Sequence, residues 1–250
     1  LLSVSSISKT YDGSADVTLT ADKLTFLSKT AKIKLPDTAL TFSDAQFTSK
    51  QEDGSYLPSP EVGNGKALSF TMTLTSNNYV FEGKSEGTTK VSDVFATDDV
   101  NRFTITKAAA PTVQPVELTV INGLAKTYLV NLPALPTLGD NCKYGSIKYE
   151  ACNFDLIGEG GYANSTAMIT SNDEFQLTVP AVESQAEGSV GTVGVKITTD
   201  NYQDMLLTVE VIAKNKIVPV LDGEITATPI TFGQILRVST ITGTMKDNGK

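Results

Sequence analysis

The sequence contains no histidine and no tryptophan, and only two cysteines in 250 residues. Without histidine, activation of a serine or cysteine nucleophile by an imidazole is excluded, and so is the usual general base near neutral pH. The absence of histidine and the low cysteine count also argue against a structural zinc site. Basic residues are scarce as well, because 20 Lys and Arg stand against 28 Asp and Glu, for a net charge of -8. We therefore expect no nucleic-acid partner and no cofactor.

Long apolar runs are missing too. None approaches the roughly 20 residues that cross a bilayer, so we expect no membrane insertion in this segment. The start Leu1-Leu2-Ser3 lacks the basic and apolar regions of a signal peptide. The chain is therefore either cytosolic or an interior fragment of an exported protein. The repeat and the short final unit described below favour the exported fragment.

No segment keeps a helical apolar period for three turns, whereas alternation typical of strands is common. In residues 67–75, Leu68, Phe70, Met72 and Leu74 share one face, which predicts that they are buried together. Similar alternation occurs in 31–35, 175–179, 193–197 and 205–211, with turn-formers such as Asp12-Gly13 and 158–161 between the strands. The pattern predicts an all-β chain of antiparallel, Ig-like β-sandwiches.

A short pattern occurs twice, at a period of about 120 residues. Lys9-Thr10-Tyr11 is followed by Asn78-Tyr79, and Lys126-Thr127-Tyr128 is followed by Asn201-Tyr202. Each repeat is long enough to bury a core of its own. We therefore predict tandem domains arranged end to end, each contacting neighbouring repeats of the same chain.

Domain boundaries are predicted from composition. The first domain spans 1–108, and residues 109–115 form an extended linker because Pro111 and Pro115 disfavour helix in the residues before them. A second domain spans 116–214. Residues 215–250 are too few to bury a stable core alone and are expected to begin a further, incomplete repeat module.

The first 108 residues resemble the YDG domain. The resemblance is carried by Tyr11-Asp12-Gly13 with its flanks, by Val62-Gly63-Asn64-Gly65-Lys66, by Asn77-Asn78-Tyr79 and by Ile105-Thr106-Lys107-Ala108. Such domains recur in large bacterial surface and adhesin-like proteins, so the resemblance implies an extracellular protein on the bacterial cell surface or secreted. The second repeat has Leu129-Val130 in place of Asp-Gly and looks like a divergent bacterial Ig-like domain. Residues 227–236 are similar to the opening of another module found beside YDG domains.

The residues behind the resemblance have plain structural interpretations. Asp12-Gly13 predicts a turn in which Gly13 adopts a positive φ. The rings of Tyr11, Tyr79 and Tyr202 are expected to be buried at strand corners, where each hydroxyl meets a backbone group. Asn78 and Asn201 precede two of these tyrosines and are assigned the same structural role. The alternative is a ligand-stacking role for the tyrosines.

Cys142 and Cys152 are separated by nine residues that include Tyr144-Gly145-Ser146. If this stretch turns the chain, the two sulfurs can face each other across a hairpin and form a disulfide in an oxidising compartment. Two free thiols are the alternative.

Acidic pairs are the only candidates for catalysis or calcium binding. Asp98-Asp99 and Asp173-Glu174 could nominally supply two carboxylates for a glycosidase, and Asp98-Asp99 and Asn172-Asp173-Glu174 could line a calcium site. Neighbouring side chains in a strand point to opposite faces, and acidic pairs are usually solvated loop residues. We therefore expect no enzymatic activity and no metal.

Two functions remain open. The chain is either a non-catalytic stalk module of a bacterial cell-surface, adhesin-like protein, or a module that binds a host glycan or extracellular protein through tyrosines such as Tyr56, Tyr149 or Tyr162. A more remote alternative is a set of accessory domains of a secreted glycoside-active enzyme. The sequence does not identify a ligand or the mechanism by which the protein is anchored to the cell.

Overall fold

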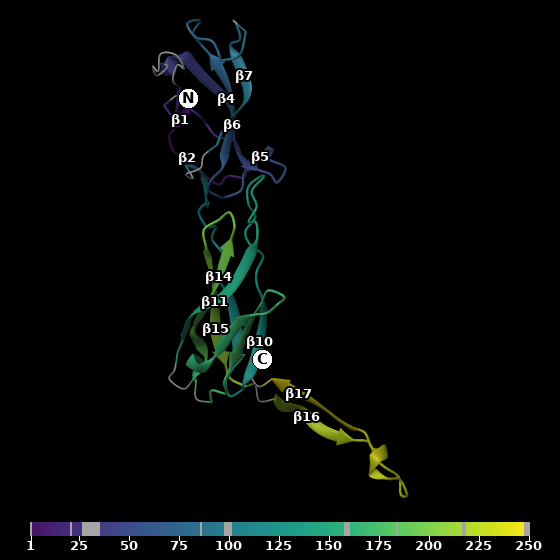
Figure 1. Ribbon diagram of the computed structural model, residues 1–250. Helices are drawn as coiled ribbons and strands as arrows, with labels where there is room; N and C mark the ends of the chain where they lie inside the picture. Colours follow the sequence, from purple (N-terminus) through teal and green to yellow (C-terminus); the bar gives the residue numbers. More distant parts are fainter. Residues whose placement is uncertain are drawn as a thin grey trace. The chain divides into compact units, whose positions relative to one another are not determined.

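A computed structural model describes residues 2–20, 22–26, 36–85, 87–97, 102–157, 161–183, 185–216 and 219–247. These residues form β-strands with three short 3-10 turns and no α-helix in the described ranges, so the all-β prediction is confirmed (Figure 1). The predicted strand at 31–35 lies outside the described residues, as does most of the turn at 158–161.

The chain divides into two compact units. Unit 1 consists of Leu1–Gln114, Pro133–Glu150 and Lys196–Leu207, and unit 2 consists of Pro115–Leu132, Ala151–Val195 and Thr208–Lys250. Unit 1 therefore includes two segments from the second sequence repeat, which we call the cap segments, 133–150 and 196–207. The domain boundaries predicted at 108 and 116 therefore differ from the structure, in which the cap segments belong to unit 1. This assignment depends on contacts between side chains far apart along the chain.

Unit 1 is built on a four-stranded sheet in the order β5-β4-β6-β7. Its strands are β4 (Leu40–Lys50), β5 (Tyr56–Pro58), β6 (Ala67–Leu74) and β7 (Lys90–Ala96), and two further pairs are β1 (Leu2–Val4) with β3 (Leu24–Phe26) and β2 (Ile7–Thr10) with β8 (Phe103–Thr106). A 3-10 turn, η1 (Asp37–Ala39), precedes β4.

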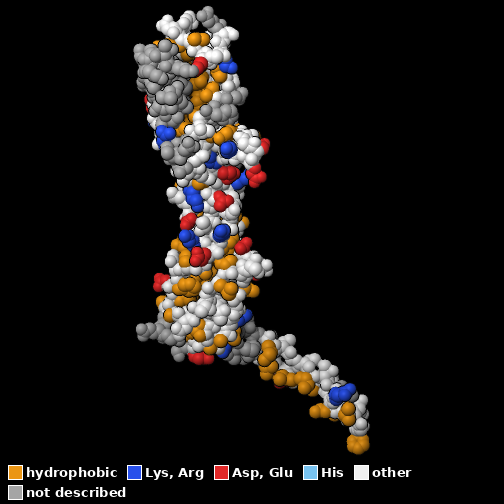
Figure 2. Space-filling view, viewed as in Figure 1, with side chains coloured by type: hydrophobic (Ala, Val, Ile, Leu, Met, Phe, Trp, Pro, Cys, Tyr) orange, Lys and Arg blue, Asp and Glu red, His pale blue; other side chains and the backbone are white. Residues whose placement is uncertain are grey.

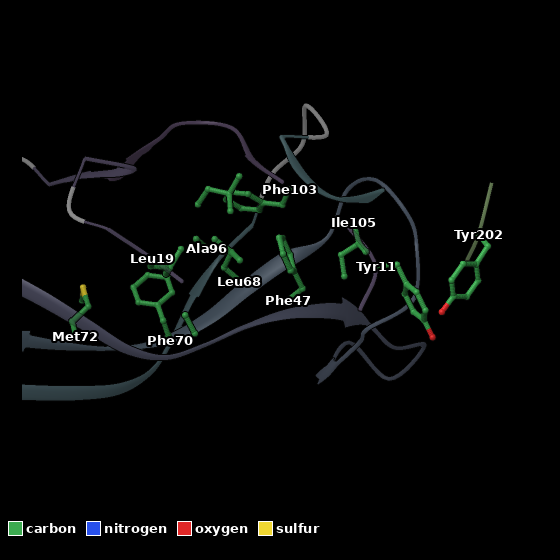
Figure 3. Packing of buried hydrophobic residues seen from close by; sticks show 12 residues of the cluster. Tyr11, Leu19, Phe47, Leu68, Phe70, Met72, Ala96, Phe103, Ile105 and Tyr202 are labelled. Atoms are coloured by element: carbon green, nitrogen blue, oxygen red, sulfur yellow. The ribbon is translucent and has the colours of Figure 1, made fainter. Parts of the chain in front are cut away.

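The core of unit 1 lies between the long sheet and the β2-β8 pair. Leu68, Phe70, Met72 and Leu74 of β6 are 0%, 1%, 8% and 8% exposed, so the predicted buried face is confirmed. Figure 3 shows this cluster running from Met72 to Tyr11 and Tyr202. Tyr202 comes from a cap segment, so residues of both sequence repeats fill one core.

Unit 2 contains a β-sandwich. One sheet has the order β10-β13-β12 and the other the order β11-β14-β15-β9 (Figure 1). The strands are β9 (Val116–Ile121), β10 (Lys126–Asn131), β11 (Ile147–Leu156), β12 (Thr166–Ile169), β13 (Glu174–Val179), β14 (Gly188–Thr199) and β15 (Met205–Lys214), with a 3-10 turn η2 (Tyr162–Asn164) before β12. Strands β11, β14 and β15 also contribute residues to unit 1.

In each sequence repeat, a strand near the start pairs in parallel with a strand near the end. β2 pairs in parallel with β8, matching Ile7 with Phe103, and β9 pairs in parallel with β15, matching Leu118 with Val211. The fold class is as predicted, and these two parallel pairs are exceptions to its antiparallel pairing. A parallel pair joins strands distant in sequence, and alternation within a strand carries no information on the direction of its partner. The two repeats share this pairing, although the repeated motif falls on different strands: Lys9-Thr10 lies in β2, whereas Lys126-Thr127-Tyr128 lies in β10.

The C-terminal part of unit 2 is a hairpin of β16 (Pro219–Ala227) and β17 (Ile241–Asp247), with the turn η3 (Leu236–Val238) in its connection.

Candidate functional site: the tyrosine cluster and polar cleft of unit 1

The cap segments join unit 1 through backbone hydrogen bonds at the end of β8. Ala108 forms a parallel bridge with Tyr202, because the Ala108 amide donates to the Asn201 carbonyl and the Gln203 amide donates to the Ala108 carbonyl, each at 2.9 Å. The connection between β14 and β15, which contains Asn201 and Tyr202, is thus held against the chain just beyond β8.

Three aromatic rings from separate segments pack together here, and we call them the tyrosine cluster: Tyr11, Tyr144 and Tyr202. The ring of Tyr202 lies 5.7 Å from that of Tyr11 in an edge-on arrangement (Figure 3). It lies 5.3 Å from the ring of Tyr144. The Tyr11 hydroxyl accepts a hydrogen bond from the Lys143 amide at 2.9 Å, and the Tyr144 hydroxyl donates to the Pro136 carbonyl at 2.8 Å. Both hydroxyls thereby satisfy backbone groups of the cap segments.

Asn201 is the polar centre of the site and is 1% exposed. Its side-chain oxygen accepts from the Val62 amide at 3.2 Å, while its nitrogen donates to Glu61 Oε2 at 2.8 Å and to the Lys143 carbonyl at 3.1 Å. Both polar atoms of this buried amide are therefore bonded within the protein. The arrangement fixes the loop 61–62 to both cap segments.

The Asp12-Gly13 turn also meets a cap segment. Asp12 Oδ1 accepts from the Ser14 amide at 2.9 Å and lies 2.7 Å from Lys9 Nζ. Burial opposes ionisation of Asp12, but the hydrogen bonds from Lys9 and Ser14 outweigh it and lower the pKa. Gly13 has φ 77°, and a Cβ there would lie 2.7 Å from the backbone carbonyl of Asn141. Only glycine allows this approach.

A polar cleft of about 690 Å³ opens beside Asn201. It is lined by Glu61, Val62, Lys107, Gly145, Ser146, Lys148, Thr198, Thr199, Asp200 and Asn201. The Ser146 amide donates to Asp200 Oδ2 at 2.7 Å, and Lys107 Nζ donates to the Thr199 carbonyl at 2.6 Å. The hydrogen bonds from Ser146, with the nearby charge of Lys107 and Lys148, lower the pKa of Asp200.

Lys66 is a buried amine that the sequence did not reveal. It is 6% exposed, and its Nζ donates to Ser59 Oγ at 2.7 Å and to Ser49 Oγ at 3.2 Å. Burial lowers the pKa of Lys66, and the charge of Glu61 opposes this shift only in part. Lys66 follows the turn at Asn64-Gly65, and nothing in that local sequence distinguishes a buried lysine from a solvated one.

The buried amine predicts a pH dependence. Because the pKa of Lys66 is lower in the folded state than in the unfolded state, the unfolded chain binds more protons between the two values, and stability rises with pH across that window towards the unfolded pKa of about 10.4. The free energy of unfolding of the wild type relative to Lys66→Met should therefore increase from neutral pH towards that value. Urea unfolding of both proteins at several pH values measures this, and a difference independent of pH would contradict it.

For Tyr202 we expect the opposite trend, in which stability falls as the pH rises above about 10. Burial, followed by the neighbouring Cys142, raises the pKa of Tyr202 to about 12. The stabilisation that follows from this shift, about 2–3 kcal/mol of unfolding free energy, is fully present below the unfolded pKa of about 10. It is lost as the pH rises through the folded value. Burial also raises the pKa values of Tyr11, Tyr144 and Tyr162. The ultraviolet absorbance of tyrosinate should therefore show several late-titrating groups, and one fewer of them in Tyr202→Phe. Equal titration curves per tyrosine in both proteins would contradict this assignment.

The structure places the other predicted tyrosines differently from one another. Tyr79 is 37% exposed in the connection between β6 and β7, so the expectation of a buried ring there is wrong. Asn78 is also exposed, and its amide donates to Ser76 Oγ. Tyr128 lies in β10, and its hydroxyl accepts from the Ile121 amide at 2.9 Å. The structure therefore brings Tyr11 together with Asn201 and Tyr202 but leaves Asn78 and Tyr79 apart from them.

The candidate ligand-stacking tyrosines are not fully exposed. Tyr162 is 0% exposed and its hydroxyl donates to Asn122 Oδ1 at 2.8 Å, so it cannot serve as a surface platform. Tyr56 and Tyr149 are half-buried. Asn122 in turn donates to the Gln185 carbonyl and to Asn215 Oδ1, which makes a second buried polar centre, in unit 2.

Cys142 and Cys152 are both free thiols in the structure. This agrees with the alternative of two free thiols and not with the predicted disulfide. The disulfide interpretation required the residues before Gly145 to form a hairpin with the strand that carries Cys152. That strand, β11, pairs with β14 instead, and residues 132–146 contain no strand. Cys142 packs against the hydrophobic core of unit 1.

The acidic pairs form no site in the described ranges. Asp98 and Asp99 lie outside the described residues. Asp173 occupies a tight turn before β13 with φ 58°, and the Glu174 amide donates to Thr170 Oγ1. Within the part of the chain that the structure describes, no group of three or more carboxylate or thiol side chains is placed to hold a metal ion.

Comparisons with known proteins give distant structural likeness only. No protein-family model and no curated protein matches the sequence. Among solved structures, a Drosophila N-cadherin fragment (EC1-3) is 11% identical with a TM-score of 0.33, over 88% of this chain and 66% of that one. An endo-fucoidan hydrolase of glycoside hydrolase family 107 is 14% identical with a TM-score of 0.28, over 72% and 24%. Sidekick-1 immunoglobulin domains 1-4 are 10% identical with a TM-score of 0.26, over 75% and 43%.

Among the described residues, no helix has the length and apolar character required to span a bilayer.

Proposed function

We propose that this chain is a non-catalytic structural module, a stalk segment, of an extracellular adhesin-like protein on a bacterial surface. The observation that carries the proposal is the shared core of consecutive sequence repeats, in which Tyr202 and Asn201 of the second repeat complete the buried end of the first. A repeat that fills its neighbour's core passes load along the chain through packed side chains and hydrogen bonds.

The chemistry of the site supports the same proposal. The Asn201 amide bonds to Val62, Glu61 and Lys143, and the tyrosine hydroxyls of Tyr11 and Tyr144 bond to backbone groups. These polar groups form their hydrogen bonds with other groups of the protein. A catalytic site instead needs a nucleophile or base aimed at open space with a partner to activate it. The resemblance of residues 1–108 to the YDG domain supports the bacterial surface.

The test is a binding and turnover screen of the whole chain against glycans and extracellular-matrix proteins. The stalk proposal predicts no saturable binding and no hydrolysis. A specific interaction with a dissociation constant below about 100 μM, worth about 5.5 kcal/mol, would overturn it. Loss of that interaction in Tyr56→Ala or Tyr149→Ala would assign it to the surface of β5 or of β11, the strands that carry these tyrosines.

A glycan-binding role is the second candidate, and the polar cleft is the observation that favours it. Its volume of about 690 Å³ lies within the range of roughly 300–1,000 Å³ that holds small ligands. Lys148 and Asp200 line it and provide donors and acceptors for sugar hydroxyls. If this role holds, Lys148→Ala abolishes the interaction, while Lys50→Ala, at an exposed position on β4, leaves it unchanged.

A further inference from the structure

The parallel pair β2–β8 is placed so that tension along the chain pulls its two strands past each other. The chain enters β2 at Ile7, which is paired with Phe103. It leaves β8 at Thr106, which is paired with Thr10. Entry and exit therefore lie at opposite ends of the ladder. A pull on the two ends of the first repeat shears this ladder along its length.

The second repeat has the same arrangement in unit 2. The chain enters β9 at Val116, paired with Val209, and leaves β15 at Lys214, paired with Ile121. At the exit end, the Asn122 amide adds a hydrogen bond to the Lys214 carbonyl at 2.8 Å. Because the bonds of a parallel ladder are evenly spaced along the strands, tension of this kind stretches all of them together.

Backbone hydrogen bonds close the β2–β8 ladder at both ends. At the entry end, the Ile7 amide donates to the Arg102 carbonyl at 2.9 Å. At the exit end, the Tyr11 amide donates to the Thr106 carbonyl at 2.8 Å. Neither end of this ladder is frayed, so β2 cannot begin to slide along β8 without breaking bonds over its whole length.

The exit strand of each parallel pair is also bonded on its other edge. Ile105 of β8 exchanges two backbone hydrogen bonds with Gly63, each 3.0 Å long, and β15 pairs with β14. The side chains of Phe103 and Ile105 are 0% and 1% exposed, and those of Val209 and Val211 are both 0% exposed. Sliding of either pair therefore also displaces close-packed core side chains.

The hairpin β16–β17 has the opposite geometry. Its strands are antiparallel, and Pro219, where the chain enters, is paired with Asp247, where it leaves. Tension therefore acts at one end of this ladder and opens its hydrogen bonds one after another. Hydrophobic side chains are exposed along the hairpin (Figure 2), with Leu221, Ile241 and Met245 at 49%, 73% and 66% exposure. Little side-chain packing opposes its opening.

We propose that the β2–β8 and β9–β15 pairs act as shear clamps, which keep each repeat folded when the chain is pulled lengthwise. The hairpin opens first under the same tension. This role rests on the proposed stalk function, since a stalk transmits to the cell the pull on whatever it carries. The two proposals fail separately. A ligand found in the binding screen would overturn the stalk, whereas the force measurements below test the clamps alone.

Pulling single molecules of the full chain from two pairs of attachment points tests the first clamp. One handle stays at the N-terminus, and the other is attached at Thr112, beyond β8, or at Arg102, before β8; both residues are exposed. The ladder is sheared in the Thr112 geometry and unzipped in the Arg102 geometry. At one pulling speed, shearing should need at least about twice the unfolding force. Equal forces in the two geometries would overturn the proposal.

Proline variants test the same clamp without moving the handles. Because the amides of Ile7 and Tyr11 donate to β8, alternation directs the Lys9 amide to β8 and the Ser8 amide away from it. In the shear geometry, Lys9→Pro should therefore unfold at a force at least about a fifth below that of Lys9→Ala, which keeps the donor.

Ser8→Pro is the matched control, since it adds the same ring in the same strand without removing a ladder donor. Its unfolding force in the shear geometry should equal that of the wild type, and the low-force opening of the hairpin should be unchanged in every variant. Equal losses of force in Lys9→Pro and Ser8→Pro, or no loss in Lys9→Pro relative to Lys9→Ala, would also overturn the shear clamp.

Discussion

Replacing Tyr202 by alanine should lower the free energy of unfolding of unit 1 by about 3–4 kcal/mol, because a buried aromatic ring is lost and a cavity remains. Tyr202 is 8% exposed and packs edge-on against Tyr11. Although Tyr202 belongs to the second sequence repeat, the loss should appear in the first. Urea unfolding monitored by amide signals of β4 and β6 measures it.

The control for this prediction is Tyr202→Phe, which keeps the ring and should cost about 1 kcal/mol or less. The exposed Tyr79, at 37% exposure, provides a second control in the corresponding Asn-Tyr pair of the first repeat. Tyr79→Ala should change stability by less than about 0.5 kcal/mol. Similar losses at Tyr79 and Tyr202 would contradict the role of the cap segments.

Replacing Gly191 by alanine should destabilise unit 2 by about 3 kcal/mol or more, because both backbone strain and a steric clash oppose the new Cβ. Gly191 lies in β14 with φ 118°, and an ideal Cβ would be 1.9 Å from the Asp155 carbonyl oxygen. That atom belongs to the backbone of β11, so relief requires the two strands to separate. Thermal unfolding of the variant is the measurement.

A substitution at Gly188 serves as the control that separates the cost of backbone strain from the cost of the steric clash. It lies in the same strand with φ 126°, but no atom lies within 4 Å of its ideal Cβ. Gly188→Ala should therefore show only the cost of the positive φ, about 1–3 kcal/mol. If the two glycine variants unfold at the same temperature, the close approach of β11 and β14 is not as described.

Strands with strict alternation could be predicted from the sequence. In 67–74 the pattern alone identified the buried face of β6, because a one-residue shift would expose Leu68 and Phe70, which are 0% and 1% exposed. The parallel partners of β2 and β9 could not be predicted in this way. Pairing between chain ends is set by tertiary packing, which leaves no periodic signal in either strand.

The site was only half predictable. Tyr11 and the Asp12-Gly13 turn stand out as a motif, and Asn201-Tyr202 stands out as a repeated pair. The sequence gives no indication that these two motifs, 190 residues apart, share one core. Asn78-Tyr79 looks equivalent in sequence, yet Tyr79 is exposed while Tyr202 is buried. Burial of a motif depends on what packs against it.

Lys66 and the hairpin illustrate two further limits. A lysine after a glycine turn is usually solvated, and only the placement of Ser49 and Ser59 reveals that Lys66 is enclosed. In 219–247, the alternation of Ile241 and Met245 indicates a buried face, but the structure leaves that face exposed. Periodicity reports which side chains need burial and not what buries them.

Amide hydrogen exchange of the full chain tests most directly whether the cap segments belong to the core of the first repeat. The decisive amides are those of Lys143, bonded to the Tyr11 hydroxyl, and of Ala108, bonded to the Asn201 carbonyl. The shared core predicts that they open with the same free energy as the Ile105 amide, which donates to the Gly63 carbonyl. Fast exchange at Lys143 and Ala108 while Ile105 stays protected would contradict it.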